Sequence, residues 1–275
     1  MLLKFFGLTY ILSWLWFGTA AYILRCTGST PAGAGSFLFL PGVIMPALVA
    51  IALSARSEGR AGMSELLYGI IQWRVNFGSY VFAIGFMIAI KLASAVVYRM
   101  AMGAWPVFTA LPWYFIAIAV LFSTPVQAGE EVGWRGFALP RLAKRFGLAT
   151  ASLILGVIWA AWHLPFFFIP GADNVGQSFP IYLCAVTAIS VAMAWLYWRT
   201  NQSLLLAMLM HASIDNTAGI VTSPVPAGVS NPFALPYAPL PWITAAVLCA
   251  SAIWFLAQMR NRRRKMPRLN LPLFL

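Results

Sequence analysis

The sequence predicts an all-α polytopic membrane protein with about eight transmembrane helices. Its 275 residues are 61% hydrophobic and only 9% charged, and the mean hydropathy is +0.83. A soluble domain would carry about 25% charged residues. The apolar residues form long unbroken runs rather than the short alternating segments of a β-barrel. We therefore expect one helical membrane domain covering residues 1–275.

Eight apolar segments are candidates for membrane spans because each approaches the ~20 residues that a bilayer core requires. They cover residues 5–24, 37–53, 77–97, 111–127, 149–168, 179–198, 204–221 and 240–259. The first segment is longer than the ~7–15 apolar residues of a signal peptide, and no A-x-A site follows it. We therefore expect it to be a retained span.

Two connections have a predicted structure of their own. In the connection 55–76, apolar side chains recur at the spacing of one helical face; they are Met63, Leu66, Leu67, Ile70 and Ile71. We expect a short helix there that lies on the inner leaflet. The connection 223–241 contains six prolines, which predicts an irregular cap rather than a helix.

The net charge of +12 suits nucleic acid, but its distribution argues against that partner. With the N-terminus inside, the inner segments contain 15 of the 18 basic residues. These are Lys4, Arg56, Arg60, Arg74, Arg135, Arg141, Lys144, Arg145, Arg199, Arg260, Arg262, Arg263, Arg264, Lys265 and Arg268. Arg25 and Arg99 fall outside, and Lys91 falls within a span, where we expect it to reach an interface or an ion pair. The pattern predicts a protein of the bacterial plasma membrane with both termini cytoplasmic, and the tail RNRRRK suits anionic lipid headgroups of the bilayer.

The residues that can exchange protons are few and lie within or beside apolar segments. The chain has six acidic residues and two histidines. Glu130 and Glu131 end one apolar segment, and His163 and His211 lie inside two others. A charge in hydrocarbon costs about 2.5–3.5 kcal/mol on insertion scales. A chain that keeps such groups there is expected to use them in a functional site.

The first motif is Glu130-Glu131-x-x-x-Arg135. On a helix, Glu131 and Arg135 are four residues apart and can pair. Glu130 projects about 100° away from Glu131, so it can remain free. The alternative is that these charges merely end a span at the inner interface.

The second and third motifs are Trp159-x-x-x-His163 and His211-x-x-x-Asp215, with Asn216 beside the latter. His211 and Asp215 share one helix face, so the carboxylate can orient the imidazole or join it in binding an ion. Asn216 offers an amide donor. The alternatives are that His163 hydrogen-bonds a neighbouring helix and that His211 and Asp215 form a local surface pair.

Together these residues form a possible hydrolytic set. Glu130 can act as general base toward a water that His163 orients, and His211 with Asp215 or Asn216 can stabilise an oxyanion or hold a metal. Glu130, His163 and His211 are also a plausible zinc set, so the cofactor is either a divalent metal such as zinc or none. The chain has neither HExxH nor G-x-S-x-G. The reaction this set favours is direct attack of activated water on a peptide bond.

The three motifs resemble those of the CPBP family of intramembrane proteases, which includes type II CAAX prenyl proteases and bacteriocin-processing, Abi-like enzymes. That family's pattern is EExxxR, FxxxH and HxxxN or HxxxD on three helices in this order. The matching segments are Glu130-Glu131-Val-Gly-Trp-Arg135, Trp159-Ala-Ala-Trp-His163 and His211-Ala-Ser-Ile-Asp215. Tryptophan replaces phenylalanine in the second segment, and aspartate ends the third.

The resemblance covers about residues 115–219 and implies a CAAX-protease-like helical bundle with a buried polar site. It implies an intramembrane endopeptidase, a class often described as metalloproteases. Glu130 would activate the water with His163 as its partner, and His211 and Asp215 would complete the site. Glu131, Arg135, Trp159 and Asn216 would support these groups, and Trp159 is bulky enough to narrow the pocket.

The expected substrate is a peptide or membrane protein, either a prenylated CAAX C-terminus or a leader peptide. Two other functions use the same buried groups: an ion- or proton-coupled transporter, and a non-catalytic immunity or scaffold protein. One geometric conflict also needs an answer. With straight spans, Glu130 lies at the inner end of its helix, whereas His163 lies ~20 Å along its own helix. Only a continued, tilted or broken helix brings them together.

Overall fold

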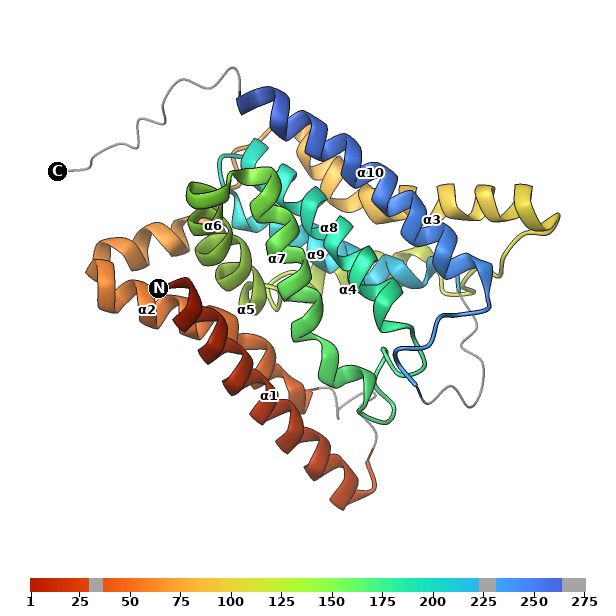
Figure 1. The fold of residues 1–275 in the computed structure, drawn as a ribbon, viewed down its shortest axis with the longest axis horizontal. Helices are drawn as coiled ribbons and strands as arrows, with labels where there is room; N and C mark the ends of the chain where they lie inside the picture. Colours follow the sequence, from red (N-terminus) through yellow and green to blue (C-terminus); the bar gives the residue numbers. More distant parts are fainter. Residues whose placement is uncertain (30–36, 223–230, 264–275) are drawn as a thin grey trace.

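The computed structural model of the protein describes residues 1–29, 37–222 and 231–263, and these residues are mostly helical (Figure 1). The helices in chain order are α1 (Leu2–Thr27), α2 (Leu40–Tyr68), η2 (Gly69–Ile71), α3 (Phe77–Met102), α4 (Trp113–Ser123), α5 (Ala128–Glu131), η3 (Val132–Ala138), α6 (Leu139–Phe146), α7 (Leu148–Trp162), η4 (Leu164–Phe167), α8 (Phe179–Arg199), α9 (Leu204–Thr217), η5 (Ala218–Ile220) and α10 (Pro239–Arg263). In the described ranges, β-pairing is limited to one isolated bridge between Phe108 and Val221.

The all-α membrane class is confirmed, but the helices differ in length from the predicted set. Five helices of the described chain are long and apolar enough to cross a membrane: α1, α2 with its flanking turns, α3, α8 and α10. A sixth candidate is the pair Trp113–Ser123 and Ala128–Phe146, which is bent by 44°. The other two predicted spans are the shorter apolar helices Leu148–Trp162 and Leu204–Ile220. The described residues thus contain five or six helical candidates for full spans, where we predicted eight.

The shortened helix α7 has a local cause. It ends at Trp162, and His163 begins a 3-10 turn that contains Pro165. Proline disfavours the helical conformation of the residue before it and cannot continue the hydrogen-bond ladder. The predicted segment 149–168 therefore breaks at His163 instead of continuing as one span.

The helix predicted in the connection 55–76 is present, but it is continuous with the preceding span. Gly59 has φ 66° and ψ −156° inside α2, and this non-helical residue separates two helical halves. Only glycine adopts such a conformation readily. Leu66 of the predicted apolar face is buried, whereas Ile71 is exposed. The placement of this half on the inner leaflet stays a prediction.

Part of the proline-rich connection lies outside the described residues, namely 223–230. The described remainder, 231–238, is irregular, and α10 begins at Pro239. The prediction of an irregular segment therefore holds for 231–238.

Helix α9 lies in the middle of the molecule, behind α7 and α8 in the view of Figure 1. It packs against α3, α4, α5 and α8, and His211 is only 3% exposed. Ser203 caps its N-terminus by accepting from the Leu206 N–H at 3.2 Å. The third motif is therefore buried, and α5, which contains Glu130 and Glu131, is one of the helices around it.

The segment Ala128–Phe146, which follows α4, is helical throughout and encloses Arg135. Glu130 ends no helix: α5 continues through the π-helix η3 and then α6 to Phe146. Arg135 is fully buried in η3, where it forms the predicted pair with Glu131; its place on the inner side of the membrane stays a prediction. The bend before α5 and the break of α7 at His163 show how the two motifs meet. Glu130 lies in the first turn of the segment Ala128–Phe146, directly after the 44° bend, and its carboxylate accepts a hydrogen bond from Trp159 of α7.

Candidate active site

Close packing on α2 fixes the orientation of the segment with the first motif. A Cβ atom on Gly133 would lie 2.6 Å from the carbonyl oxygen of Pro46, and one on Gly129 would lie 3.1 Å from the Ile44 Cα. Only glycine permits this approach of two helix backbones. With the glycine face against α2, Glu130 and Glu131 are directed toward α7 and α9.

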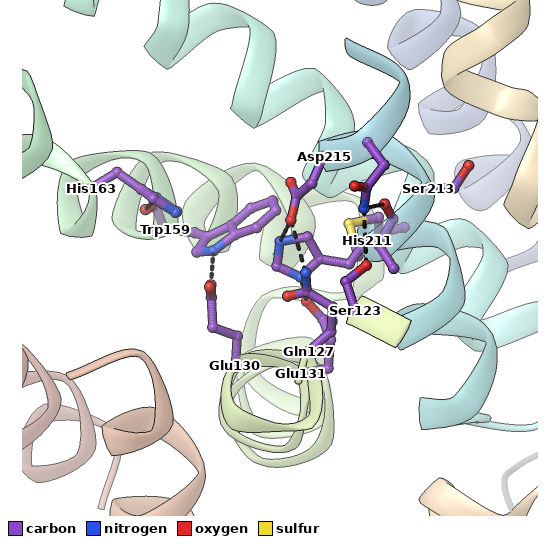
Figure 2. A network of polar contacts seen from close by, with 12 residues as sticks. Ser123, Gln127, Glu130, Glu131, Trp159, His163, His211, Ser213 and Asp215 are labelled. Carbon is purple, nitrogen blue, oxygen red and sulfur yellow. Dashed lines mark hydrogen bonds and ion pairs between the residues drawn. The ribbon is translucent and has the colours of Figure 1, made fainter. Parts of the chain in front are cut away.

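Glu130 accepts hydrogen bonds from two tryptophan side chains. Its Oε2 atom accepts from Trp159 Nε1 at 2.7 Å (Figure 2). It also accepts from Trp134 Nε1 at 3.2 Å. The residue is 5% exposed. Indole N–H groups donate and cannot accept, so they favour a carboxylate oxygen. Within the described residues, no protein donor reaches the Oε1 atom, which leaves that oxygen for a water or substrate.

Glu131 forms the predicted pair with Arg135 and a second contact to the third motif. Its Oε1 atom lies 2.7 Å from Arg135 Nη1 and 2.8 Å from His211 Nδ1. All three side chains are buried. The Arg135 guanidinium also lies 4.1 Å from the ring centroid of Trp159. Glu131 therefore connects η3 to α9 and orients the imidazole of His211.

His163 is the residue at which α7 ends, and its ring is held by a backbone carbonyl of the last turn of α7. The Nδ1 atom lies 2.9 Å from the carbonyl oxygen of Trp159. Because a carbonyl oxygen only accepts, Nδ1 bears the proton in this contact and Nε2 remains a free acceptor in the neutral ring. The ring also contacts Tyr182 of α8, with centroids 5.8 Å apart.

Asp215 lies next to His211 but beyond hydrogen-bond distance. Its Oδ2 atom is 3.6 Å from His211 Nε2 and accepts from Gln127 Nε2 at 2.8 Å. Asn216 does not join the cluster: its amide donates to Ser123 Oγ at 2.9 Å and to a carbonyl of its own helix. Of the two candidate partners of His211 on α9, only Asp215 is near the imidazole.

Trp159 connects the parts of the site. Figure 2 shows its indole between His163 and His211, with Glu130 reaching it from α5. The indole lies 5.7 Å from the His163 ring centroid and 5.1 Å from that of His211. A phenylalanine, which the family pattern has here, lacks the N–H that donates to Glu130. Only the size of Trp159 was apparent from the sequence. The structure adds a hydrogen bond from its indole N–H to Glu130.

The donor set does not fit a metal held by Glu130, His163 and His211. Two indole N–H groups point at one Glu130 oxygen and occupy it as hydrogen-bond donors. The indole also separates the two imidazoles. Across the described residues, no three His, Cys, Asp or Glu side chains form a group that could hold a metal ion. The prediction of a metalloprotease is therefore not supported.

The sequence did not predict the contacts of Gln127 with Asp215, of Trp134 with Glu130 and of Lys91 with Val221. Gln127 is a buried polar residue one helical turn before Glu131, and Trp134 is one turn after Glu130. Both positions share helix faces with the glutamates, which is the signal that could have found them. Among the described residues Lys91 has no ion-pair partner, and its Nζ donates to the carbonyl oxygen of Val221 at 3.3 Å; that it reaches an interface stays a prediction.

The fold and the site define a polytopic helical membrane protein with buried carboxylates and imidazoles, an arrangement suited to hydrolysis. Residues 109–217 match the family model described as type II CAAX prenyl endopeptidase Rce1-like. A curated relative, CAAX prenyl protease 2 from Methanococcus maripaludis, is 25% identical over 225 residues, which cover 78% of this chain and 80% of the relative. These matches confirm the resemblance drawn from the three motifs, and they indicate a membrane peptidase. The family match spans every residue of the site.

Proposed function

We propose that the protein is an intramembrane endopeptidase in which Glu130 activates a water molecule for attack on a peptide bond. The observation that carries this proposal is the environment of Glu130. Two indole donors hold one oxygen of its buried carboxylate, while the other oxygen has no protein donor among the described residues. A positioned carboxylate with one free oxygen can accept a proton from water.

The proposed reaction begins with the water between Glu130 and His163. The Nε2 lone pair of His163 accepts a hydrogen bond from this water and orients it. Glu130 Oε1 takes one proton as the water oxygen attacks the carbonyl carbon of the substrate. The C–N bond of the tetrahedral intermediate then breaks, and the proton on Glu130 passes to the leaving amine. The products are a carboxylate and a new N-terminus.

His211 is suited to stabilise the oxyanion of the intermediate. Its Nδ1 atom faces Glu131 at 2.8 Å and its Nε2 atom faces Asp215 at 3.6 Å. Two nearby carboxylates favour an N–H on each ring nitrogen of His211. Because the Asp215 oxygen is beyond hydrogen-bond distance, the Nε2–H can donate to an oxyanion that lies closer. Glu131, Arg135 and Gln127 act through His211 and Asp215 and are therefore positioning residues.

The substrate that the similarity favours is a peptide with a prenylated C-terminus in the bilayer. This class follows from the name of the Methanococcus maripaludis relative; leader peptides and other membrane proteins are the second class. The basic residues on the inner segments favour cytoplasmic termini in a bacterial plasma membrane. A substrate C-terminus would then enter from the cytoplasmic side.

The experiment is quantitative mapping of new peptide termini in membranes that contain wild-type protein or the Glu130→Gln variant. A matched control is Glu65→Gln, which makes the same change at an exposed carboxylate. The proposal expects termini that depend on wild type and on the control and that disappear with Glu130→Gln. Cleavage that persists in Glu130→Gln at the wild-type level contradicts it. Proton or ion flux in liposomes without any cleavage would instead favour a transporter.

A further inference from the structure

Helix α1 lies outside the segment that matches the family model, yet it contacts the helix end that presents His163. The Tyr10 hydroxyl donates to the carbonyl oxygen of Ile158. Trp14 Nε1 donates to the carbonyl oxygen of Trp162 at 2.9 Å. Both acceptors lie in the final turns of α7, and Trp162 directly precedes His163. These bonds join residues 148 positions apart in the sequence.

The end of α7 needs such donors because the last four carbonyls of a helix have no partner within it. In a hydrocarbon environment no water can replace the missing donors. The carbonyl oxygen of Trp159 accepts from the His163 ring, and the carbonyl oxygen of Ala160 accepts from the His163 backbone N–H. Trp14 supplies the donor for Trp162. A side chain of α1 therefore completes the hydrogen bonds of the turn that orients His163.

The buried face of α1 also packs against both helices that contain the proposed water-activating pair. Phe17 contacts Trp162, with ring centroids 5.3 Å apart, and Phe166, at 4.6 Å. These two rings flank His163 in the sequence. Phe5 contacts Trp134, with ring centroids 5.6 Å apart. The indole of Trp134 donates to Glu130. One straight helix thus spans from the surroundings of Glu130 to those of His163.

We propose that Trp14 and Tyr10 are positioning residues that fix the His163 imidazole relative to Glu130. In this role they act through the α7 end, whose place and rotation they set. The consequence for turnover rests on the proposed function, whereas the consequence for the His163 ring does not. The chain allows a separate measurement of that ring because it contains only two histidines.

The test compares Trp14→Phe with Trp16→Phe. Both tryptophans are on α1, both are 38% exposed, and both donate to a backbone carbonyl, but the acceptor of Trp16 is Leu38 at 2.7 Å, which is not on α7. Each variant loses one N–H and keeps an aromatic ring. Tyr10→Phe is the second variant, because it removes only a hydroxyl and keeps the packing.

The measurement is histidine-selective ¹⁵N NMR of the full chain in lipid nanodiscs, with a His163→Gln sample to assign the two rings. We expect Trp14→Phe and Tyr10→Phe to shift the imidazole signals of His163 and to leave those of His211 in place, and Trp16→Phe to change neither. Unchanged His163 signals in both test variants, or equal shifts in the Trp16→Phe control, would overturn the proposal.

An activity measurement separates this inference from the proposed function. With a cleavable prenylated peptide, Trp14→Phe should lower kcat roughly two- to tenfold with little change in KM, as expected for a lost hydrogen bond that positions a reacting group. A wild-type protein without any cleavage contradicts the peptidase proposal, while the NMR comparison still decides the role of α1. A wild-type kcat in both test variants would oppose the inference even if cleavage is confirmed.

Discussion

The buried pair of Glu131 and Arg135 should have a large effect on stability when only one partner is removed. Its nitrogen–oxygen distance is 2.7 Å and both side chains are 0% exposed. Arg135→Leu would leave the Glu131 carboxylate buried with only His211 as a partner. Breaking such a pair costs about 3–5 kcal/mol. For a chain of this size, each kcal/mol shifts Tm by about 2–4 °C, so we expect Tm to fall by roughly 6–20 °C.

The chain offers a matched control for this prediction. Arg141 and Glu58 are also 2.7 Å apart, but their side chains are 23% and 44% exposed. Arg141→Leu should therefore cost only about 0–1 kcal/mol. Thermal unfolding followed by circular dichroism in one detergent measures both variants. Equal shifts of Tm in the two variants would refute the reasoning from burial.

A double variant tests whether the cost comes from the unpaired charge. Arg135→Leu combined with Glu131→Gln removes both charges, so its unfolding free energy should be higher than that of Arg135→Leu alone. A double variant that is less stable by the sum of the two single losses would show that the pair has no coupling.

Three further predictions concern the site. Trp159→Phe removes the N–H at 2.7 Å from Glu130 and should destabilise the fold by about 1.5–3 kcal/mol, the value for a hydrogen bond to a charged group; chemical unfolding measures this, and a loss under 0.5 kcal/mol would oppose it. Gly133→Ala places a Cβ against the backbone of Pro46 and should lower Tm strongly, whereas Gly85→Ala, which meets nothing within 4 Å, should leave it unchanged; similar Tm values for both would be contrary. Treatment with EDTA should leave any cleavage rate unchanged, because the donor set around Glu130 does not suit a metal; a rate restored only by zinc would reverse that conclusion.

The parts of the site that the sequence predicted depend on contacts within one helix. The Glu131–Arg135 pair follows from a spacing of four residues, and the structure contains it. His211 and Asp215 follow from the same spacing, and their side chains are neighbours. Such pairs are set by helix geometry, so no knowledge of tertiary packing is required.

The contacts between helices could not be predicted in the same way. The bond from Trp159 to Glu130 depends on how α5 and α7 are rotated against each other, and no spacing within either segment encodes it. The burial of Arg135 could not be predicted, because charge counting assigns an arginine to one side of the membrane and does not say whether protein encloses it. In the structure, a buried carboxylate and an indole ring compensate that charge inside the protein.

The number of spans was overestimated for a related reason. Hydropathy identifies an apolar segment but not whether lipid or protein surrounds it. Helix α9 is apolar because other helices enclose it, and it is too short to count as a span. His163 lies at the end of α7. Helix ends are the least predictable part of a segment, so the position of this site residue could not be predicted accurately.

The central claim is that Glu130 activates the water that cleaves a peptide bond. The most direct measurement is the turnover of a prenylated reporter peptide by purified protein in liposomes, with wild type and Glu130→Gln at equal amounts of folded protein. The account predicts a loss of about 10²–10⁴-fold in kcat for the variant, the contribution of a general base, with an unchanged helical spectrum. A Glu130→Gln protein that cleaves the reporter at the wild-type rate would contradict it.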